Sequence, residues 1–237
     1  MSAAKKPVRK SLSRDLILEA ALDIVDSDQV RELTMSRLGT ALGADPSAVY
    51  RHFRNKDELL LAMADAMLEE VAADFDRSDD PMKNLAAMGW ALRNGYLRRP
   101  GLAQEVAARF TGGRAEAQLV IEMLTSVEQL GFSRQEAIPI TRAFAEMTLG
   151  HVLMTADVLS LPSAKQAYDL QMATTYYSAP YNPASPLPPA EQREATRADS
   201  DAVFTTMIET FLTGLATREP AARGTRRSGR TAKRSVR

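Results

Sequence analysis

Apolar residues recur at every third or fourth position along most of this chain, a spacing that is typical of amphipathic α-helices. The first such run, Arg14–Asp26, follows Ser13, a residue well suited to cap a helix. A longer run covers Lys56–Phe75. Glycine and proline breaks separate three more runs, near Met82–Arg98, Leu102–Phe110 and Ala115–Leu130. The last two extend from Ser133 to about Leu159 and over Arg197–Leu215, so the pattern predicts an all-α fold.

Two short helices joined by a tight turn are predicted between the first two runs. Thr34 can cap a helix over Met35–Leu42, and Gly43 stands where a left-handed residue would end it. Asp45 can cap the next helix, with Pro46 at its first position, where no N–H is needed. This short connection predicts a helix-turn-helix.

The second of these helices, predicted over Pro46–Phe53, has a face suited to a DNA major groove. At about 100° per residue, Val49 and Phe53 turn inward. The outward and flanking positions are Ser47, Ala48, Tyr50, Arg51 and His52. Small residues permit close approach, arginine can bind a guanine edge, and the two rings can hydrogen-bond phosphates. Spacing alone leaves open a surface helix of any helical protein.

A family resemblance rests on the run LTMSRLGTALGADPSAVYRHFRNKDELL. Within it, Asn55 and Glu58 form a possible capping box that opens the Lys56–Phe75 helix. The run resembles the N-terminal DNA-binding domain of the TetR family of bacterial transcriptional regulators, over roughly Ser13–Leu61. Positions that fit the family pattern are Leu33-Thr34, Leu42-Gly43, Val49-Tyr50, His52-Phe53 and Asn55-Lys56. A helix-turn-helix followed at once by YRHFRNKDEL is a specific combination.

The resemblance implies a DNA-binding domain over residues 13–57 and a larger helical ligand-binding and dimerisation domain over 58–217. It also implies that the Lys56–Phe75 helix couples the two. The residues predicted to contact DNA are Arg14, Thr34, Ser36, Arg37, Ser47, Ala48, Tyr50, Arg51, His52 and Lys56. Lys56 can hold a phosphate with help from the positive end of the helix dipole.

Charge is distributed unevenly, although the total is zero. Residues 1–14 carry five cations and residues 220–237 carry seven, both without an acid, so residues 15–219 have a net charge of −12. We expect a flexible basic arm over residues 1–12 and a disordered basic tail over 218–237. Both can add salt-dependent affinity for DNA, or serve only to keep the protein in solution.

The C-terminal part contains two complications. Pro139 falls within the first two turns of the helix that Ser133 opens, which predicts a kink or a delayed start near Ile138. The stretch SAPYNPASPLPPAEQ contains five prolines and is predicted not to be helical, although Leu161–Tyr177 before it can hold one more helix.

In the family, the last two long helices pair with their copies to form a homodimer, here Ile138–Leu159 and Asp201–Leu215.

The candidate dimer residues are Phe144, Gly150, Phe204, Met207, Ile208, Phe211 and Leu215. The alternative is that both stripes face the core of their own chain.

Methionine adapts to irregular apolar ligands, and seven of the eleven methionines lie between Met82 and Met207. The candidate residues for lining a ligand pocket are Trp90, Tyr96, Phe110, Met123, Phe144, Met147, His151 and Met154, with plain core packing as the alternative.

Enzymatic chemistry finds little support. The absence of cysteine excludes disulfides, thiolate metal sites and cysteine nucleophiles. Gly112-Gly113 is an isolated glycine pair, and His151 is the one histidine outside the helix-turn-helix. Tetracycline-binding members of the family use histidines around a magnesium ion, and this chain has no matching set. We expect no cofactor and no catalytic site.

The resulting hypothesis is a transcriptional repressor. Its homodimer would bind a palindromic double-stranded operator and would be released by an apolar small-molecule effector of unknown identity. No apolar run approaches the roughly 20 residues of a membrane span, so we expect a soluble, cytoplasmic protein with no membrane partner. The alternatives are a ligand-independent architectural or adaptor protein that binds DNA, and a helical enzyme with an incidental helix-turn-helix.

Overall fold

The structure is a computed structural model that describes residues 12–27, 33–177 and 189–220, without the side chains of 174–197. Within these residues every regular element is a helix, which confirms the predicted all-α class. The basic arm up to residue 11 and the tail from residue 221 lie outside the described residues. The helices are α1 (Arg14–Ser27), α2 (Met35–Ala41), α3 (Pro46–Tyr50), α4 (Lys56–Asp74), α5 (Pro81–Leu97), α6 (Pro100–Val106), α7 (Arg114–Gln129), α8 (Arg134–Ser160), α9 (Ser163–Tyr177) and α10 (Pro189–Thr217).

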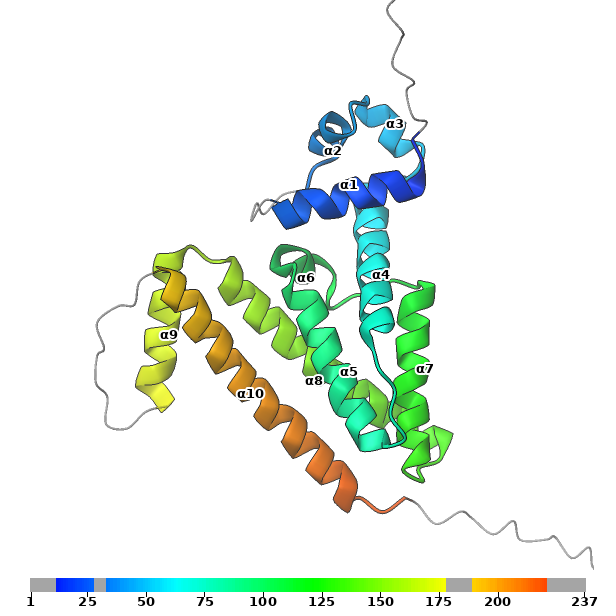
Figure 1. Ribbon diagram of the computed structural model, residues 1–237, viewed down its shortest axis with the longest axis vertical. Coiled ribbons are helices and arrows are strands. Elements are labelled where there is room, and N and C mark those ends of the chain that lie inside the picture. The colour runs from blue at the N-terminus through cyan, green and yellow to red at the C-terminus, as the bar shows by residue number, and fades with distance from the viewer. Residues whose placement is uncertain (1–11, 28–32, 178–188, 221–237) are drawn as a thin grey trace, which may run out of the picture.

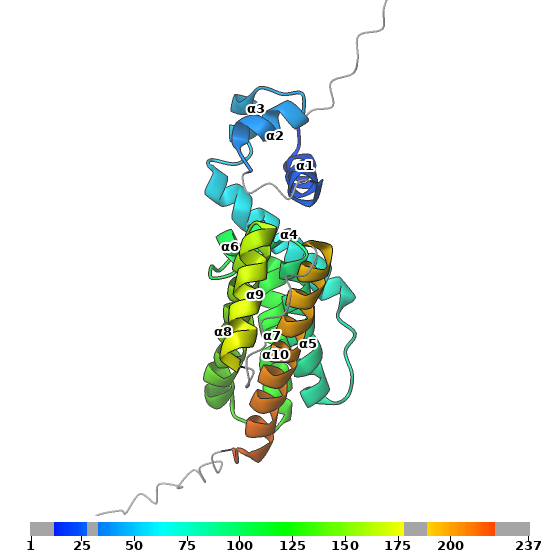
Figure 2. The same cartoon turned by 90° about the vertical axis from the view of Figure 1, so that its left-hand side faces the viewer.

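Helices α1, α2 and α3 form a small domain at one end of an elongated molecule (Figures 1 and 2). Helix α4 leaves this domain and runs into a larger body that contains α5, α6, α7, α8 and α10 (Figure 1). Helix α9 packs on α10 and α8 at the side of that body. The end of α4 near α3 and its far end therefore belong to different domains.

Local capping explains where several helices begin. The Thr34 side chain accepts the N–H of Arg37 at the start of α2. Asn55 accepts the N–H of Glu58 at the start of α4, whereas the Glu58 carboxylate accepts the N–H of Arg54, so only the first half of the predicted capping box is present. Gly43 has φ +58°, so the turn between α2 and α3 uses the left-handed conformation predicted for it. These caps and the turn are confirmed. Each involves residues no more than four positions apart, so the sequence alone was enough to predict it.

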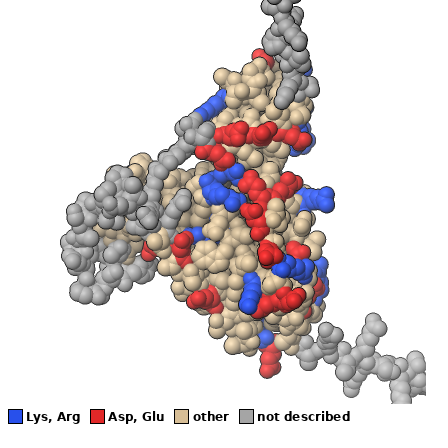
Figure 3. Space-filling view, viewed as in Figure 1, with Lys and Arg blue, Asp and Glu red and all other residues tan. Residues whose placement is uncertain are grey.

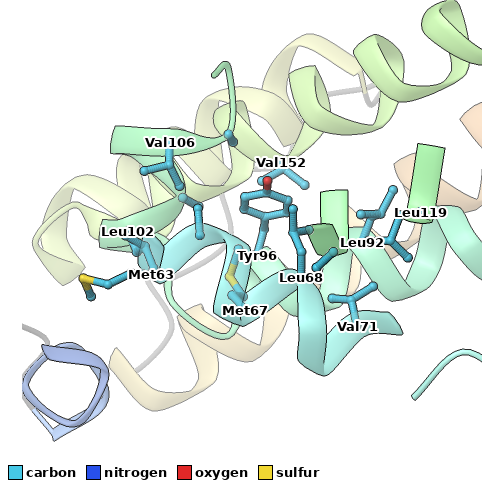
Figure 4. Close-up of a cluster of buried hydrophobic side chains, with 14 of the residues drawn as sticks. Met63, Met67, Leu68, Val71, Leu92, Tyr96, Leu102, Val106, Leu119 and Val152 are labelled. Atoms are coloured by element: carbon cyan, nitrogen blue, oxygen red, sulfur yellow. The ribbon is translucent and has the colours of Figure 1, made fainter. Parts of the chain in front are cut away.

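Core side chains from five helices meet along α4 (Figure 4). Met63, Met67 and Val71 of α4 are buried there. They lie in one cluster with Tyr96 of α5 and Val152 of α8. Because α4 contributes to this cluster over several turns, it is an integral part of the body as well as the exit from the small domain.

Several predicted boundaries are wrong. Helix α6 covers Pro100–Val106 instead of Leu102–Phe110, because Pro100 takes the first helical position. Helix α8 begins at Arg134 and passes through Pro139 without a delayed start, because the capping box of Ser133 and Glu136 fixes its first turn. Helix α10 begins at Pro189, four residues inside the stretch predicted to be non-helical, since proline is tolerated at a first helical position. Helix α3 ends at Tyr50 rather than Phe53. The rest of the proline-rich stretch, residues 178–188, lies outside the described residues.

In the described part of the chain, none of the helices has the length and apolar character needed to cross a bilayer.

Candidate nucleic-acid interface and body cavity

Helix α3 presents its polar side to solvent at the end of the molecule. Val49 and Phe53 are fully buried beneath it. Ser47 and Arg51 are exposed, as is Tyr50, whose exposed fraction is 48%. Ala48 and His52 are half-buried at its edges. The structure therefore anchors the helix through two apolar side chains and leaves the predicted reading face open.

Sequence reasoning missed Gly39, which brings α2 and α3 together. A Cβ atom at this buried position would lie 2.9 Å from the carbonyl oxygen of Ala44 and 3.2 Å from the nitrogen of Pro46. Both neighbours are backbone atoms, which cannot move aside as a side chain can. The angle between the two helices of the motif thus depends on a glycine in α2. A glycine within a helical run is the signal that could have pointed to it.

The α2 candidates lie around the start of that helix. Thr34 and Ser36 are exposed and Arg37 is half-buried. The Thr34 hydroxyl is used in the cap, and the backbone carbonyl of Ser36 accepts a hydrogen bond from Thr40. Their positions beside α3 leave the two exposed side chains accessible from the same end of the molecule.

Arg14, which is predicted to contact phosphate, also makes bonds within the protein. Its Nη1 donates to the carbonyl oxygen of His52 at 2.8 Å and to Glu58 Oε1 at 3.0 Å. Its guanidinium carbon lies 4.1 Å from the centre of the Phe53 ring. The residue therefore fastens α1 to the end of the α3 turn and to α4, a role that no local sequence pattern reveals.

Glu58 completes this junction. It accepts hydrogen bonds from the backbone N–H and the Nε of Arg54 at 3.0 and 3.1 Å. These bonds, together with the one from Arg14, lower the pKa of Glu58 to about 2. The carboxylate is therefore charged at neutral pH, and it keeps two cations beside the reading helix.

Ion pairs join the small domain to the body. The side chain of Arg99, at the start of α6, donates to Asp26 of α1 and to Glu70 of α4. Arg109 lies 2.7 Å from Asp57. Lys56 Nζ lies 3.8 Å from Glu105 of α6, so this DNA-contact candidate also faces the body. Figure 3 shows acidic and basic groups side by side across this boundary.

A cavity of about 520 Å³ lies between α8, α9 and α10. Its apolar lining comprises Met147, Gly150, Met154, Val158, Leu170, Ala173, Val203 and Met207. Three carboxylate residues, Glu146, Asp169 and Asp199, also border it. Its polar wall consists of His151, Thr155 and Ser200.

The polar wall is a buried hydrogen-bond network. The Ser200 hydroxyl lies 3.0 Å from His151 Nε2 and 3.0 Å from the Thr155 hydroxyl. Arg93, almost fully buried behind the wall, donates to Ser200 Oγ at 2.7 Å and pairs with Asp201 at 2.6 Å. Burial, and then the charge of Arg93, lower the pKa of His151 to about 4. The imidazole is therefore neutral at pH 7 and can either donate or accept a hydrogen bond.

Only part of the predicted pocket set lies at this cavity. Met147, His151 and Met154 line it. The other candidates have different places: Tyr96, Met123 and Phe144 are buried in the core, Trp90 stacks edge-on against Phe204, and Phe110 is 82% exposed beyond the end of α6. Helical spacing identified the α8 stripe but could not show which faces border empty space. Sequence reasoning did not identify Arg93 and Ser200.

The candidate dimer residues divide in the same way. Phe144, Phe204, Ile208 and Leu215 are buried in their own chain, so the alternative of core packing holds for them. Gly150 is exposed, and Met207 and Phe211 are half-buried. The outward side of α8 and α10 instead carries Ala143, Gly150, Met154, Val203, Thr206, Thr210 and Gly214.

An exposed helix-turn-helix joined by one long helix to an all-α body with a cavity defines a two-domain DNA-binding transcription regulator. The chain belongs to the tetR family of bacterial regulatory proteins, whose family description matches residues 17–63. A second family description, "Tetracyclin repressor-like, C-terminal domain", matches residues 76–219. Both domains therefore belong to the same family, as the sequence predicted.

Individual relatives span nearly the whole chain. The tetracycline repressor protein class A from transposon 1721 of Escherichia coli is 29% identical over 215 residues, covering 90% of this chain and 94% of the relative. ActR of Streptomyces coelicolor in complex with (S)-DNPA superposes with a TM-score of 0.65 at 21% identity, covering 87% of this chain and 98% of ActR. BioQ bound to its double-stranded DNA operator superposes with a TM-score of 0.59 at 22% identity, covering 87% and 99%.

Proposed function

We propose that this protein is a transcriptional repressor that binds a palindromic operator as a homodimer and is released by an apolar small molecule. The observation that carries the proposal is the exposed face of α3, in which Ser47, Tyr50 and Arg51 stand over the buried anchors Val49 and Phe53. A helix of this kind fits a major groove. The operator complex of BioQ, which shares the fold, supports the same mode of binding.

We assign different roles to the residues around α3. Arg51 reads a base edge, because its side chain is exposed in the middle of the face. Tyr50, His52 and Lys56 contact phosphates from its edges. Arg14 mainly positions the reading helix, given its bonds to His52 and Glu58.

The dimer would form through the outward side of α8 and α10. Met154 is 75% exposed and Val203 is 47% exposed there. Gly150 and Gly214 have open space where a Cβ would stand, so a second helix can approach closely. Two reading helices in such a dimer would enter successive major grooves about 34 Å apart.

The effector would bind the cavity between α8, α9 and α10, with an apolar body and one group that hydrogen-bonds His151 or Ser200. Gly150, Met154 and Val203 belong both to the cavity lining and to the proposed dimer face. A second copy would therefore close the open side of the cavity, which links effector binding to the arrangement of the dimer.

A chain of side-chain contacts leads from this cavity towards α4. Asp157 of α8, next to the lining residue Val158, accepts a hydrogen bond from Gln104 of α6 at 2.9 Å. The next residue of α6, Glu105, pairs with Lys56 at the start of α4. An effector that shifts α8 would thus displace α6 and α4. By linkage it must weaken DNA binding by the factor by which DNA weakens its own binding.

Selection of bound duplexes from a random pool tests the DNA-binding part. We expect the full chain to retain a palindrome with half-sites about one helical turn apart and to sediment as a dimer. Failure to retain any duplex at low salt would overturn the proposal. Retention of a non-palindromic sequence by a monomer would overturn the dimer.

A thermal-shift screen against apolar compounds tests the effector part. The variant Ala173→Phe fills the cavity from its α9 wall, away from the proposed dimer face. We expect it to lose stabilisation by any compound that stabilises the wild type, while it keeps its affinity for DNA. Equal stabilisation of both proteins would place the effector elsewhere.

A further inference from the structure

Helix α7 has no capping side chain of its own. It begins at Arg114, and the residue before it is Gly113, which can supply no side-chain acceptor. The first backbone N–H groups of any helix lack partners within the helix, and a side-chain oxygen normally accepts one of them. In this structure Asp65 Oδ1 accepts the N–H of Glu116, the third residue of α7, at 3.2 Å.

The capping side chain thus comes from the middle of α4, 51 positions earlier in the chain. Asp65 has the place that an N-cap aspartate would have, and its negative charge lies at the positive end of the α7 dipole. The contact therefore joins the helix that emerges from the DNA-binding domain to the beginning of a body helix.

The loop before α7 is built around this carboxylate. The Thr111 hydroxyl lies 3.1 Å from Asp65 Oδ1 and 3.1 Å from Glu116 Oε2. The N–H of Gly112 donates to Glu116 Oε2 at 2.9 Å, and the N–H of Gly113 donates to the Thr111 hydroxyl at 3.0 Å. The Thr111 hydroxyl and the N–H groups of Gly112 and Gly113 are thereby linked, directly or through Glu116, to Asp65.

Gly113 has a steric reason to be glycine. A Cβ atom there would overlap the Asp65 carboxylate. The two carboxylates also affect nearby Tyr96. Burial, and then the charges of Glu116 and Asp65, raise the pKa of Tyr96 to about 12. The backbone of the loop therefore fits against the carboxylate on one side, with the core beneath it.

Asp65 also lies on the side of α4 that faces the DNA-binding domain. Seven residues make nearly two helical turns, so Asp65 shares a side of α4 with Glu58, which binds Arg14 and Arg54. Arg14, Glu58 and Asp65 all border one crevice between α1, α4 and the loop before α7. The angle at which α4 leaves the body therefore sets the position of α3.

We propose that Asp65 is a positioning residue for DNA binding, which holds α4 at the angle the reading helix requires by capping α7. The inference rests on the proposed function only in taking duplex DNA as the ligand. Because the cap connects α4 to the body, occupation of DNA should in turn stabilise the first turn of α7.

Asp65→Ala removes the capping carboxylate. Gly113→Ala leaves the sequence of α4 unchanged but places a Cβ where the Asp65 carboxylate lies, and so displaces it. We expect each to weaken binding to the duplex selected by the wild type by about fivefold or more. Asp65→Asn should restore binding to within about twofold of the wild type, since asparagine caps helices as well as aspartate does. Glu69→Ala is the matched control: it removes a carboxylate from the next turn of α4, in the same crevice.

Hydrogen exchange supplies a readout that a purely structural role would not change. DNA should slow exchange of the Glu116 amide in the wild type and in Asp65→Asn, but not in Asp65→Ala. If Asp65→Ala does not fold, Thr111→Val takes its place with a smaller expected loss of affinity. It removes the hydroxyl that contacts Asp65, Glu116 and the N–H of Gly113, and keeps the Asp65 carboxylate itself.

The inference is overturned if Asp65→Ala binds DNA as Glu69→Ala does, if Asp65→Asn is as weak as Asp65→Ala, or if DNA leaves the Glu116 amide unchanged in the wild type. A wild type that binds no duplex would instead contradict the proposed function. The two failures are therefore distinguishable.

Discussion

Replacing Arg99 by alanine should loosen the small domain from the body. The Arg99 side chain is 10% exposed and reaches both Asp26 and Glu70. Its Nε and Nη2 bind the two oxygens of Asp26 at 2.7 and 3.0 Å, and its Nη1 and Nη2 bind Glu70 at 3.0 and 3.2 Å. Hydrogen bonds with its two acidic partners raise the pKa of Arg99 above its ordinary value, against the effect of burial.

The magnitude follows from what remains after the truncation. Hydrogen bonds to charged groups contribute about 1.5–3 kcal/mol each. The side chains of Asp26 and Glu70 are 46% and 41% exposed, so water can replace the lost arginine, and the expected loss is about 2 kcal/mol in all. In a protein of this size that corresponds to a fall of roughly 4–8 °C in the melting temperature.

Arg98 provides the matched control, because it is the adjacent residue and has the same charge. It is 48% exposed and lies 3.4 Å from Glu70 and 3.9 Å from Asp74. Arg98→Ala should cost no more than about 0.5–1 kcal/mol. Calorimetry of the two variants, with DNA affinity measured alongside, distinguishes the loss of the Arg99 bonds to Asp26 and Glu70 from the loss of one positive charge. Equal melting temperatures for Arg99→Ala and Arg98→Ala would refute the reasoning.

Three further predictions concern the reading helix and the cavity wall. Arg51→Ala should cost about 1–3 kcal/mol of specific DNA affinity and relax one base pair per half-site, and an unchanged preference in a binding selection would exclude direct readout. Gly39→Ala should reduce DNA affinity and melting temperature together, because its Cβ would meet the backbone at Ala44; wild-type values for both would contradict the close approach. The pKa of His151 is lowered from 6.5 to about 4, so the unfolded chain binds the proton more readily. Wild-type stability should therefore fall as the pH drops from about 6.5 to 4, and His151→Gln should flatten that slope in a denaturation series.

Much of the small domain was predictable from residues close together in sequence. The caps at Thr34, Asp45 and Asn55 each bond an N–H two or three positions ahead, and the turn needed only Gly43. The inward direction of Val49 followed from helical periodicity alone. Short-range hydrogen bonds and conformational preferences depend only on residues that are close in sequence, so both can be predicted from the sequence directly.

The cavity and the dimer face were predicted less well. Helical spacing showed that Phe144 and Met154 lie on one broad stripe of α8, but not that Phe144 enters the core while Met154 stays exposed. Which part of an apolar stripe is buried depends on the neighbouring helices. At Gly89, a Cβ would approach the side chains of Phe144 and Ile208, so α5, α8 and α10 together decide the orientation.

By itself, the sequence determined the helix-turn-helix, the family and the all-α class, because these rest on local capping, periodicity and a specific motif. The tertiary structure alone decided the contacts that connect the two domains. Arg14 was joined to Glu58, 44 positions later, and Asp65 became the cap of a helix that begins some fifty residues after it. Neither partner is specified by its own neighbours in sequence. A contact between residues so far apart exists only because packing of the intervening helices brings the chain back to the same place.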